Sequence, residues 1–90
     1  MPERRVAVGS KVGLHARPAA LFVQAAAKQP VKVTIAKAGK DPVDARSILA
    51  VLGLDARGGE EIVLAAEGDG ADDALDALVT VVETAHYAPE

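Results

Sequence analysis

A histidine, His15, stands two residues before an arginine, Arg17, at the start of the apolar stretch GLHARPAALF, residues 13–22. Pro18 cannot occupy a helix interior, whereas the residues that follow it, 19–22, suit a helix. We therefore expect His15 at or just before a helix start. Such a position offers unpaired backbone N–H groups and a partial positive charge, which together favour the binding of an anion.

The histidine and the arginine leave two interpretations open. In the first, the imidazole of His15 accepts a phosphoryl group, and the helix start and Arg17 hold this near-dianion through charge-assisted hydrogen bonds. In the second, His15 is a surface residue near a helix start, Arg17 is a solvated charge and Pro18 only marks the first turn. Residue types and spacing alone do not choose between them.

Ser47 is the second residue that could carry chemistry. It precedes the apolar run ILAVLG, residues 48–53, which predicts a short helix with Ser47 as its N-cap and Gly53 just past its end. So few polar side chains cannot cover every face of such a helix, so we expect part of it to be exposed as an interaction surface. A phosphate on Ser47 would place charge beside that surface and would block docking there.

Other chemistries are poorly supported. His15 and His86 fall in different elements, and no close-spaced set of histidines and carboxylates suggests a metal site or another cofactor. The absence of cysteine excludes disulfides and thiolate zinc ligands. Residues 9–13, GSKVG, contain the residue types of a phosphate loop, but in neither the order nor the spacing of a Walker A motif. We therefore expect no metal and no cofactor.

Composition narrows the class of protein further. The chain has 90 residues and a formal net charge of −3, with one Phe, one Tyr and no Trp. A nucleic-acid binder would need a basic surface or aromatic stacking platforms, so neither duplex nor single-strand binding is expected. No apolar segment reaches the length of a membrane span. A single cytoplasmic domain over residues 1–90, monomeric and not inserted in a membrane, is the expectation.

The pattern of apolar residues predicts seven elements in the order βαββαβα. The predicted strands are residues 5–8, an alternating segment from Val31 to Ala36, a short return strand at 42–43, and residues 61–65. The predicted helices are residues 18–28, 48–52, and a last one from near Gly70, with Asp72 and Asp73 in its first turn. Short hairpin-length links between strands favour an α+β fold, an antiparallel sheet with helices on one face. Pro42 predicts that the return strand lies at a sheet edge.

The core-facing sides of the two longer helices can also be assigned from spacing. Apolar residues at three- and four-residue intervals predict one buried face for each helix. For the first helix these residues are Leu21, Phe22, Ala25 and Ala26, and for the last they are Ala71, Leu75, Leu78 and Val82.

Three stretches of the chain resemble one known family. GLHARPAALFV, with its string HARPAA, resembles the active-site segment of HPr, the histidine phosphocarrier family of the bacterial phosphoenolpyruvate-dependent sugar phosphotransferase system. RSILAVLGL and the following GGEEIVLAAEG are similar to the family's serine-site helix and the strand after it. The resemblance covers nearly the whole chain. It implies an open-faced β-sandwich, with a four-stranded antiparallel sheet and three helices on one face, and a phosphoryl carrier that is not an enzyme.

The resemblance also implies roles for individual residues. His15 would accept a phosphoryl group from phosphorylated enzyme I and pass it to the enzyme IIA domains of sugar permeases. Arg17 would bind and orient that group, and the backbone amides of Ala16 and Arg17 would cap it. In the family the helix starts right after the histidine, a little before Pro18.

By the same resemblance, one surface would dock both partners, and one serine would be open to regulation. The docking residues would be Ala20, Gln24, Ile48, Leu49, Val51 and Leu52. Ser47 matches the serine that an ATP-dependent HPr kinase modifies in many Gram-positive relatives. Two alternatives stay open: a regulatory protein of the HPr fold that acts by binding alone, and a carrier in a nitrogen-related or dihydroxyacetone-kinase phosphorelay.

Overall fold

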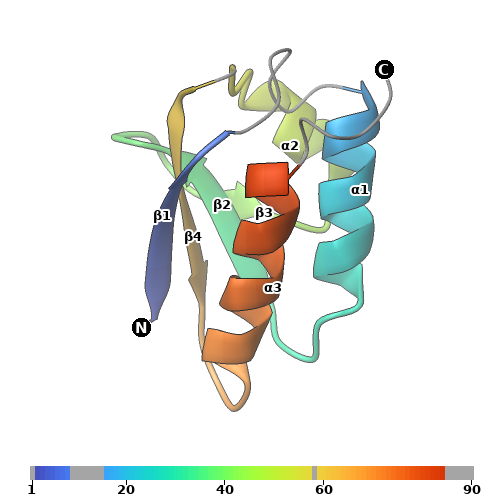
Figure 1. Cartoon of the computed structure of the whole chain (residues 1–90), viewed down its shortest axis with the longest axis vertical. Coiled ribbons are helices and arrows are strands. Elements are labelled where there is room, and N and C mark those ends of the chain that lie inside the picture. The colour runs from blue at the N-terminus through green and yellow to red at the C-terminus, as the bar shows by residue number, and fades with distance from the viewer. Residues whose placement is uncertain (1, 9–15, 58, 85–90) are drawn as a thin grey trace.

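The structure, a computed structural model, describes residues 2–8, 16–57 and 59–84 of the chain (Figure 1). Its elements follow the order expected from the sequence. They are β1 (Glu3–Ala7), α1 (Ala16–Ala27), β2 (Val33–Lys37), β3 (Val43–Asp44), α2 (Ile48–Gly53), β4 (Glu61–Ala66) and α3 (Ala71–Thr84).

The four strands form one antiparallel sheet in the order β1-β4-β2-β3. The first strand therefore pairs with the last, with Glu3 opposite Ala65, and β4 pairs on its other side with β2. The two-residue strand β3 lies at the edge beside β2, as Pro42 predicts. The prediction of an α+β open-faced sandwich is confirmed.

Alternation along the strands decides which side of the sheet the helices cover. In β4, Ile62, Leu64 and Ala66 are buried, while the intervening residues are exposed or half-buried. Helix α3 packs on β1 and β4 and lies beside α1, whereas α2 packs against α1 and β3 (Figure 1). In the part of the chain that the structure describes, no helix covers the opposite face of the sheet.

The core lies between this sheet and the helices. Its largest fully buried side chains come from α1, α3 and the two central strands: Phe22, Ile35, Ile62, Leu64, Leu75 and Leu78. Each side chain of this size stabilises the fold by about 1.5–3 kcal/mol relative to exposure in water. All four residues predicted for the core stripe of the last helix are buried, so that prediction is confirmed.

The first helix differs from the sequence prediction at two points. It begins at Ala16, two residues before Pro18. The first amides of a helix have no acceptor within it, so a proline fits anywhere in the first turn without losing a hydrogen bond. Leu21 is 42% exposed, so its assignment to the core is wrong. Ala19, Phe22 and Ala26 form the buried stripe instead, at intervals of three and four residues.

The end of the short helix also differs in detail. Gly53 was expected just past the helix, but it is the last helical residue, and Leu54 follows in a right-handed conformation. The chain turns one residue later at Asp55, whose φ of 53° lies in the left-handed region. An aspartate tolerates this conformation better than most residues, which explains why no glycine is needed there.

Candidate functional site

The start of α1 has the features expected of an anion site. Its first residue, Ala16, directly follows His15 in the sequence, and its first turn carries no acidic residue. The amides of Ala16 and Arg17 have no acceptor within the helix, and Pro18 has no amide to leave unpaired. His15 lies outside the described residues, as do the side chains of Arg17 and Pro18.

The start of α2 is held by the serine singled out in the sequence. Ser47 has an extended backbone, and its hydroxyl accepts a hydrogen bond from the amide of Ala50 at 3.3 Å. Its carbonyl accepts the amide of Val51 at 3.0 Å, which is the first bond within the helix. These contacts are those of an N-cap, so this structural prediction for Ser47 is confirmed.

An aspartate orders the turn before Ser47. The Oδ1 atom of Asp44 accepts the amide of Arg46 at 2.9 Å and lies 3.6 Å from its guanidinium. The Asp44 carbonyl accepts the amide of Ser47 at 3.1 Å. The bond from the Arg46 amide, with the charge of Arg46 behind it, lowers the pKa of Asp44 below its usual value. The cap is therefore placed by a turn that depends on an ionised carboxylate.

The residues expected to dock partners divide into exposed and buried ones. Leu49 is 79% exposed and Ile48 is 38% exposed, Gln24 is exposed, and Ala20 and Leu52 are half-buried. Val51 is fully buried, so the expectation that it lies on the docking surface is wrong. It is the one fully buried residue of α2, with Leu52 partly buried against the core beside it, and a six-residue helix needs such an anchor.

Leu21 belongs with the exposed apolar residues. Together with Ile48 and Leu49 it completes the set of large exposed hydrophobic residues in the described part of the chain, and all three lie on α1 or α2. These helices pack against each other (Figure 1). We call the residues Ala20, Leu21, Gln24, Ile48, Leu49 and Leu52 the α1–α2 surface. The sequence signal for Leu21 was its position one residue before Phe22, which turns it about 130° away from the centre of the buried stripe.

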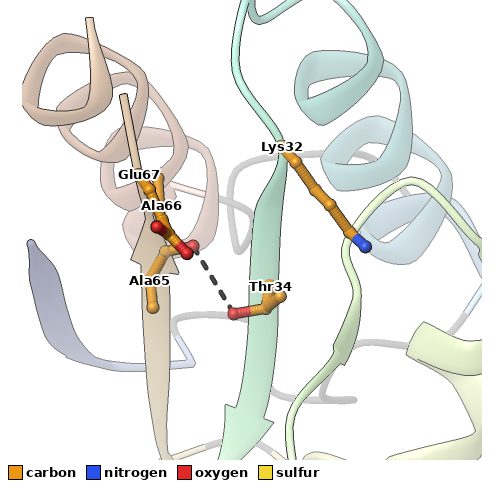
Figure 2. Close-up of a pocket in the computed structure, with 5 residues that line it drawn as sticks. All are labelled: Lys32, Thr34, Ala65, Ala66 and Glu67. Atoms are coloured by element: carbon orange, nitrogen blue, oxygen red, sulfur yellow. Dashed lines mark hydrogen bonds between the residues drawn. The ribbon is translucent and has the colours of Figure 1, made fainter. Parts of the chain in front are cut away.

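A hollow on the sheet offers no alternative site of comparable chemistry. It has a volume of about 330 Å³ and is lined by Lys32, Thr34, Ala65, Ala66 and Glu67. The Thr34 hydroxyl donates to the carbonyl of Ala65 at 3.5 Å. Lys32 and Glu67 lie on opposite sides of this hydrogen bond (Figure 2). This hollow contains none of the residues singled out for function.

The described residues contain neither a candidate metal site nor a candidate membrane span. They contain no group of three histidine, cysteine or carboxylate side chains placed to hold a metal ion. None of their helices combines the length and the hydropathy needed to cross a bilayer.

Comparison with known proteins shows which class of protein has this fold and this start of α1. The family model for the HPr component phosphorylation site of the phosphotransferase system matches residues 2–84. The chain belongs to the HPr family of the phosphotransferase system, and its relatives named phosphocarrier protein HPr are carriers rather than enzymes. The resemblance noted in the sequence is thereby confirmed.

Individual relatives agree with this assignment. The phosphocarrier protein HPr of Streptomyces coelicolor is 61% identical over 82 residues, which cover 91% of this chain and 88% of that protein. The HPr-like protein Crh of Halalkalibacterium halodurans is 42% identical over 83 residues, covering 92% and 98% of the two chains. The crystal structure of HPr-C-His from Thermoanaerobacter tengcongensis superimposes with a TM-score of 0.89 at 38% identity, over 100% of both chains.

Proposed function

We propose that this chain accepts a phosphoryl group from phosphorylated enzyme I on His15 and donates it to the enzyme IIA domains that serve sugar uptake. In the first transfer an N–P bond forms at the imidazole, while the bond that joins phosphorus to enzyme I breaks. The second transfer moves the same group from His15 to the IIA domain. The chain is a covalent carrier in both steps and needs no cofactor.

The observation that carries the proposal is that α1, in a chain of the HPr family, begins with ARPAA, the residues that directly follow His15. The helix begins at Ala16, so the residue directly before it is the histidine. A phosphoryl group on that histidine would meet the amides of Ala16 and Arg17 and the positive end of the helix. Arg17 adds a guanidinium two residues away in sequence, and Pro18 keeps the first turn in shape.

The α1–α2 surface supports the docking part of the proposal. Leu49 exposes most of its apolar side chain, and exposed apolar residues on two packed helices are typical of a protein interface. We propose that enzyme I and the IIA domains dock there in turn, with Ala20, Gln24, Ile48, Leu49 and Leu52 in contact. One surface suffices because the carrier meets its two partners at different times.

Three smaller proposals accompany this one. Residues 1–90 act as a single HPr-like domain, and the chain works as a monomer.

Ser47 is the site at which an HPr serine kinase would act. Phosphate at that cap would favour the start of α2 electrostatically and would put a dianion beside Ile48 and Leu49, which opposes docking.

The deciding experiment is the intact mass after incubation with phosphoenolpyruvate and a bacterial enzyme I. We expect a single added phosphate that acid removes and base does not, and that His15→Ala abolishes. His86→Ala is the matched control, because it removes the other histidine and leaves the HPr segment intact. Uptake of phosphate by His15→Ala at the normal rate would refute the assignment.

A regulatory protein of the HPr fold is the second candidate, and the exposed Leu49 favours docking under this alternative as well. Such a protein binds its partner regardless of the state of His15. If partner affinity is the same with and without the phosphoryl group, and no IIA domain accepts it, the regulatory function stands instead. Transfer to the IIA protein of a nitrogen-related system, or to a dihydroxyacetone-kinase subunit, in preference to sugar IIA domains would place the carrier in one of those phosphorelays.

A further inference from the structure

Helix α2 carries the most exposed part of the α1–α2 surface but is weakly held by its own residues. It has six residues, too few to be stable alone, and Val51 is its single buried side chain. Contacts at its two ends therefore add to its packing against α1 and β3 in fixing its orientation. Ser47 and Asp44 fix the first end, and a lysine from the sheet fixes the second.

Lys37, the last residue of β2, reaches the loop that follows α2. Its ammonium lies 3.4 Å from the carbonyl of Asp55, and its side chain is 25% exposed. Asp55 in turn donates its amide to the carbonyl of Leu52 at 3.1 Å, which closes the last turn of α2. One hydrogen bond thus links the sheet to Asp55, two residues past the end of α2.

Glu60 holds Lys37 in this position. Its Oε2 atom lies 3.4 Å from the ammonium of Lys37, while its Oε1 atom accepts the amide of Arg57 at 2.8 Å. The carboxylate therefore links the amide of Arg57, in the middle of the loop, to the lysine. The bond from the Arg57 amide, helped by the charge of Lys37, lowers the pKa of Glu60, so the carboxylate is ionised at neutral pH.

The same loop also contacts the strand that leads toward the histidine. The carbonyl of Glu60 accepts the amide of Val8 at 2.9 Å, and the amide of Gly59 donates to the carbonyl of Val8 at 3.0 Å. Val8 is almost completely buried, which shields these bonds from water. The loop is thus fixed on one side to the end of α2 and on the other to the extension of β1.

We infer that Lys37 and Glu60 are positioning residues for partner docking, because together they set the orientation of α2 from its C-terminal end. This inference rests on the proposed function, since it concerns the surface that enzyme I would bind. Neither residue belongs to the α1–α2 surface. Their loss should weaken docking without changing the chemistry at His15.

The test compares Lys37→Met and Glu60→Gln with a matched pair, Arg5→Met and Glu61→Gln. Arg5 and Glu61 form an exposed ion pair of 3.0 Å between β1 and β4, so the control changes the same charges away from the end of α2. The quantities measured are the KM and kcat of enzyme I for each variant as phosphoryl acceptor, and the melting temperature of each variant.

We expect Lys37→Met and Glu60→Gln each to raise the KM by about two- to tenfold with kcat unchanged, and the double variant to lose little more than either single one. The two substitutions change the net charge in opposite directions. Electrostatic steering would therefore shift the KM in opposite directions, and that result would overturn the inference. KM values equal to those of Arg5→Met and Glu61→Gln would overturn the inference too. Lys37→Arg, which keeps donors for both acceptors, should restore the KM.

Hydrogen exchange separates this inference from the proposed function. If the wild-type chain takes no phosphate from enzyme I, the proposed function fails, and the amide of Asp55 still reports on the end of α2. Faster exchange of this amide in Lys37→Met and Glu60→Gln than in the control variants supports positioning of α2. Exchange rates equal to those of the controls rule it out.

Discussion

The hydroxyl of Ser47 accepts the amide hydrogen of Ala50 across 3.3 Å, and the residue that precedes Ala50, Leu49, is the most exposed of the large apolar side chains described. The cap of α2 and the most exposed apolar residue of the α1–α2 surface are therefore separated by two positions in the chain. Any chemical change at Ser47 therefore affects both the stability of α2 and the docking of a partner on it.

Removing the cap should destabilise the protein. Ser47→Ala deletes the acceptor for the Ala50 amide, and we expect a loss of about 0.5–2 kcal/mol in the free energy of unfolding. Chemical denaturation at neutral pH measures this difference. Ser47→Asp is the informative partner, because aspartate is an equally good cap but adds charge: stability should be kept while the KM of enzyme I rises. An unchanged unfolding midpoint for Ser47→Ala would contradict the role of the cap.

Two neighbouring residues of α2 should respond in opposite ways to truncation. Leu49→Ala should change the free energy of unfolding by no more than about 0.5 kcal/mol, because the side chain is largely in water, yet it should raise the KM of enzyme I. Val51→Ala should cost about 2 kcal/mol of stability, because this side chain is fully buried. Thermal melts and transfer kinetics on the same two variants check both statements. A large loss of stability in Leu49→Ala would mean that its side chain is packed.

Acid should weaken the turn before α2 and the loop after it. The pKa values of Asp44 and Glu60 are lower in the folded protein than in the unfolded chain, so both groups stabilise the fold fully above their unfolded values of about 4. That contribution is lost as the pH falls from there through the lower folded-state values. We expect Asp44→Asn and Glu60→Gln to be less stable than the wild type at pH 7, and the difference to shrink below about pH 4. Urea unfolding at pH 7 and pH 3 tests this, and a difference independent of pH would exclude the carboxylate charge as the cause.

Much of the architecture could be predicted because local signals agree with the packing. The four residues at helical spacing in α3 are all buried, Pro42 marks the edge strand, and Ser47 caps the helix that it precedes. In each case the local preference of the residue and its packing in the fold favour the same position.

The errors arise where a short pattern fits more than one position. Pro18 is compatible with any place in a first turn, so it could not show that α1 begins at Ala16. In α2, six apolar residues give no periodicity from which to choose the buried one, and packing against the rest of the core selects Val51. The sequence also could not show the link from Lys37 to Asp55 and Glu60, because residues far apart along the chain form it.

The pairing of β1, the first strand, with β4, the last, affects how the chain folds while the ribosome is still making it. Glu3 lies opposite Ala65, so β1 has no partner until β4 (Glu61–Ala66) has been made. At about 5–20 residues per second, the new strand waits roughly 3 to 12 s for β4. During synthesis its apolar residues must therefore remain soluble beside an incomplete sheet, and the arginines at positions 4 and 5 and Glu3 keep this waiting segment charged.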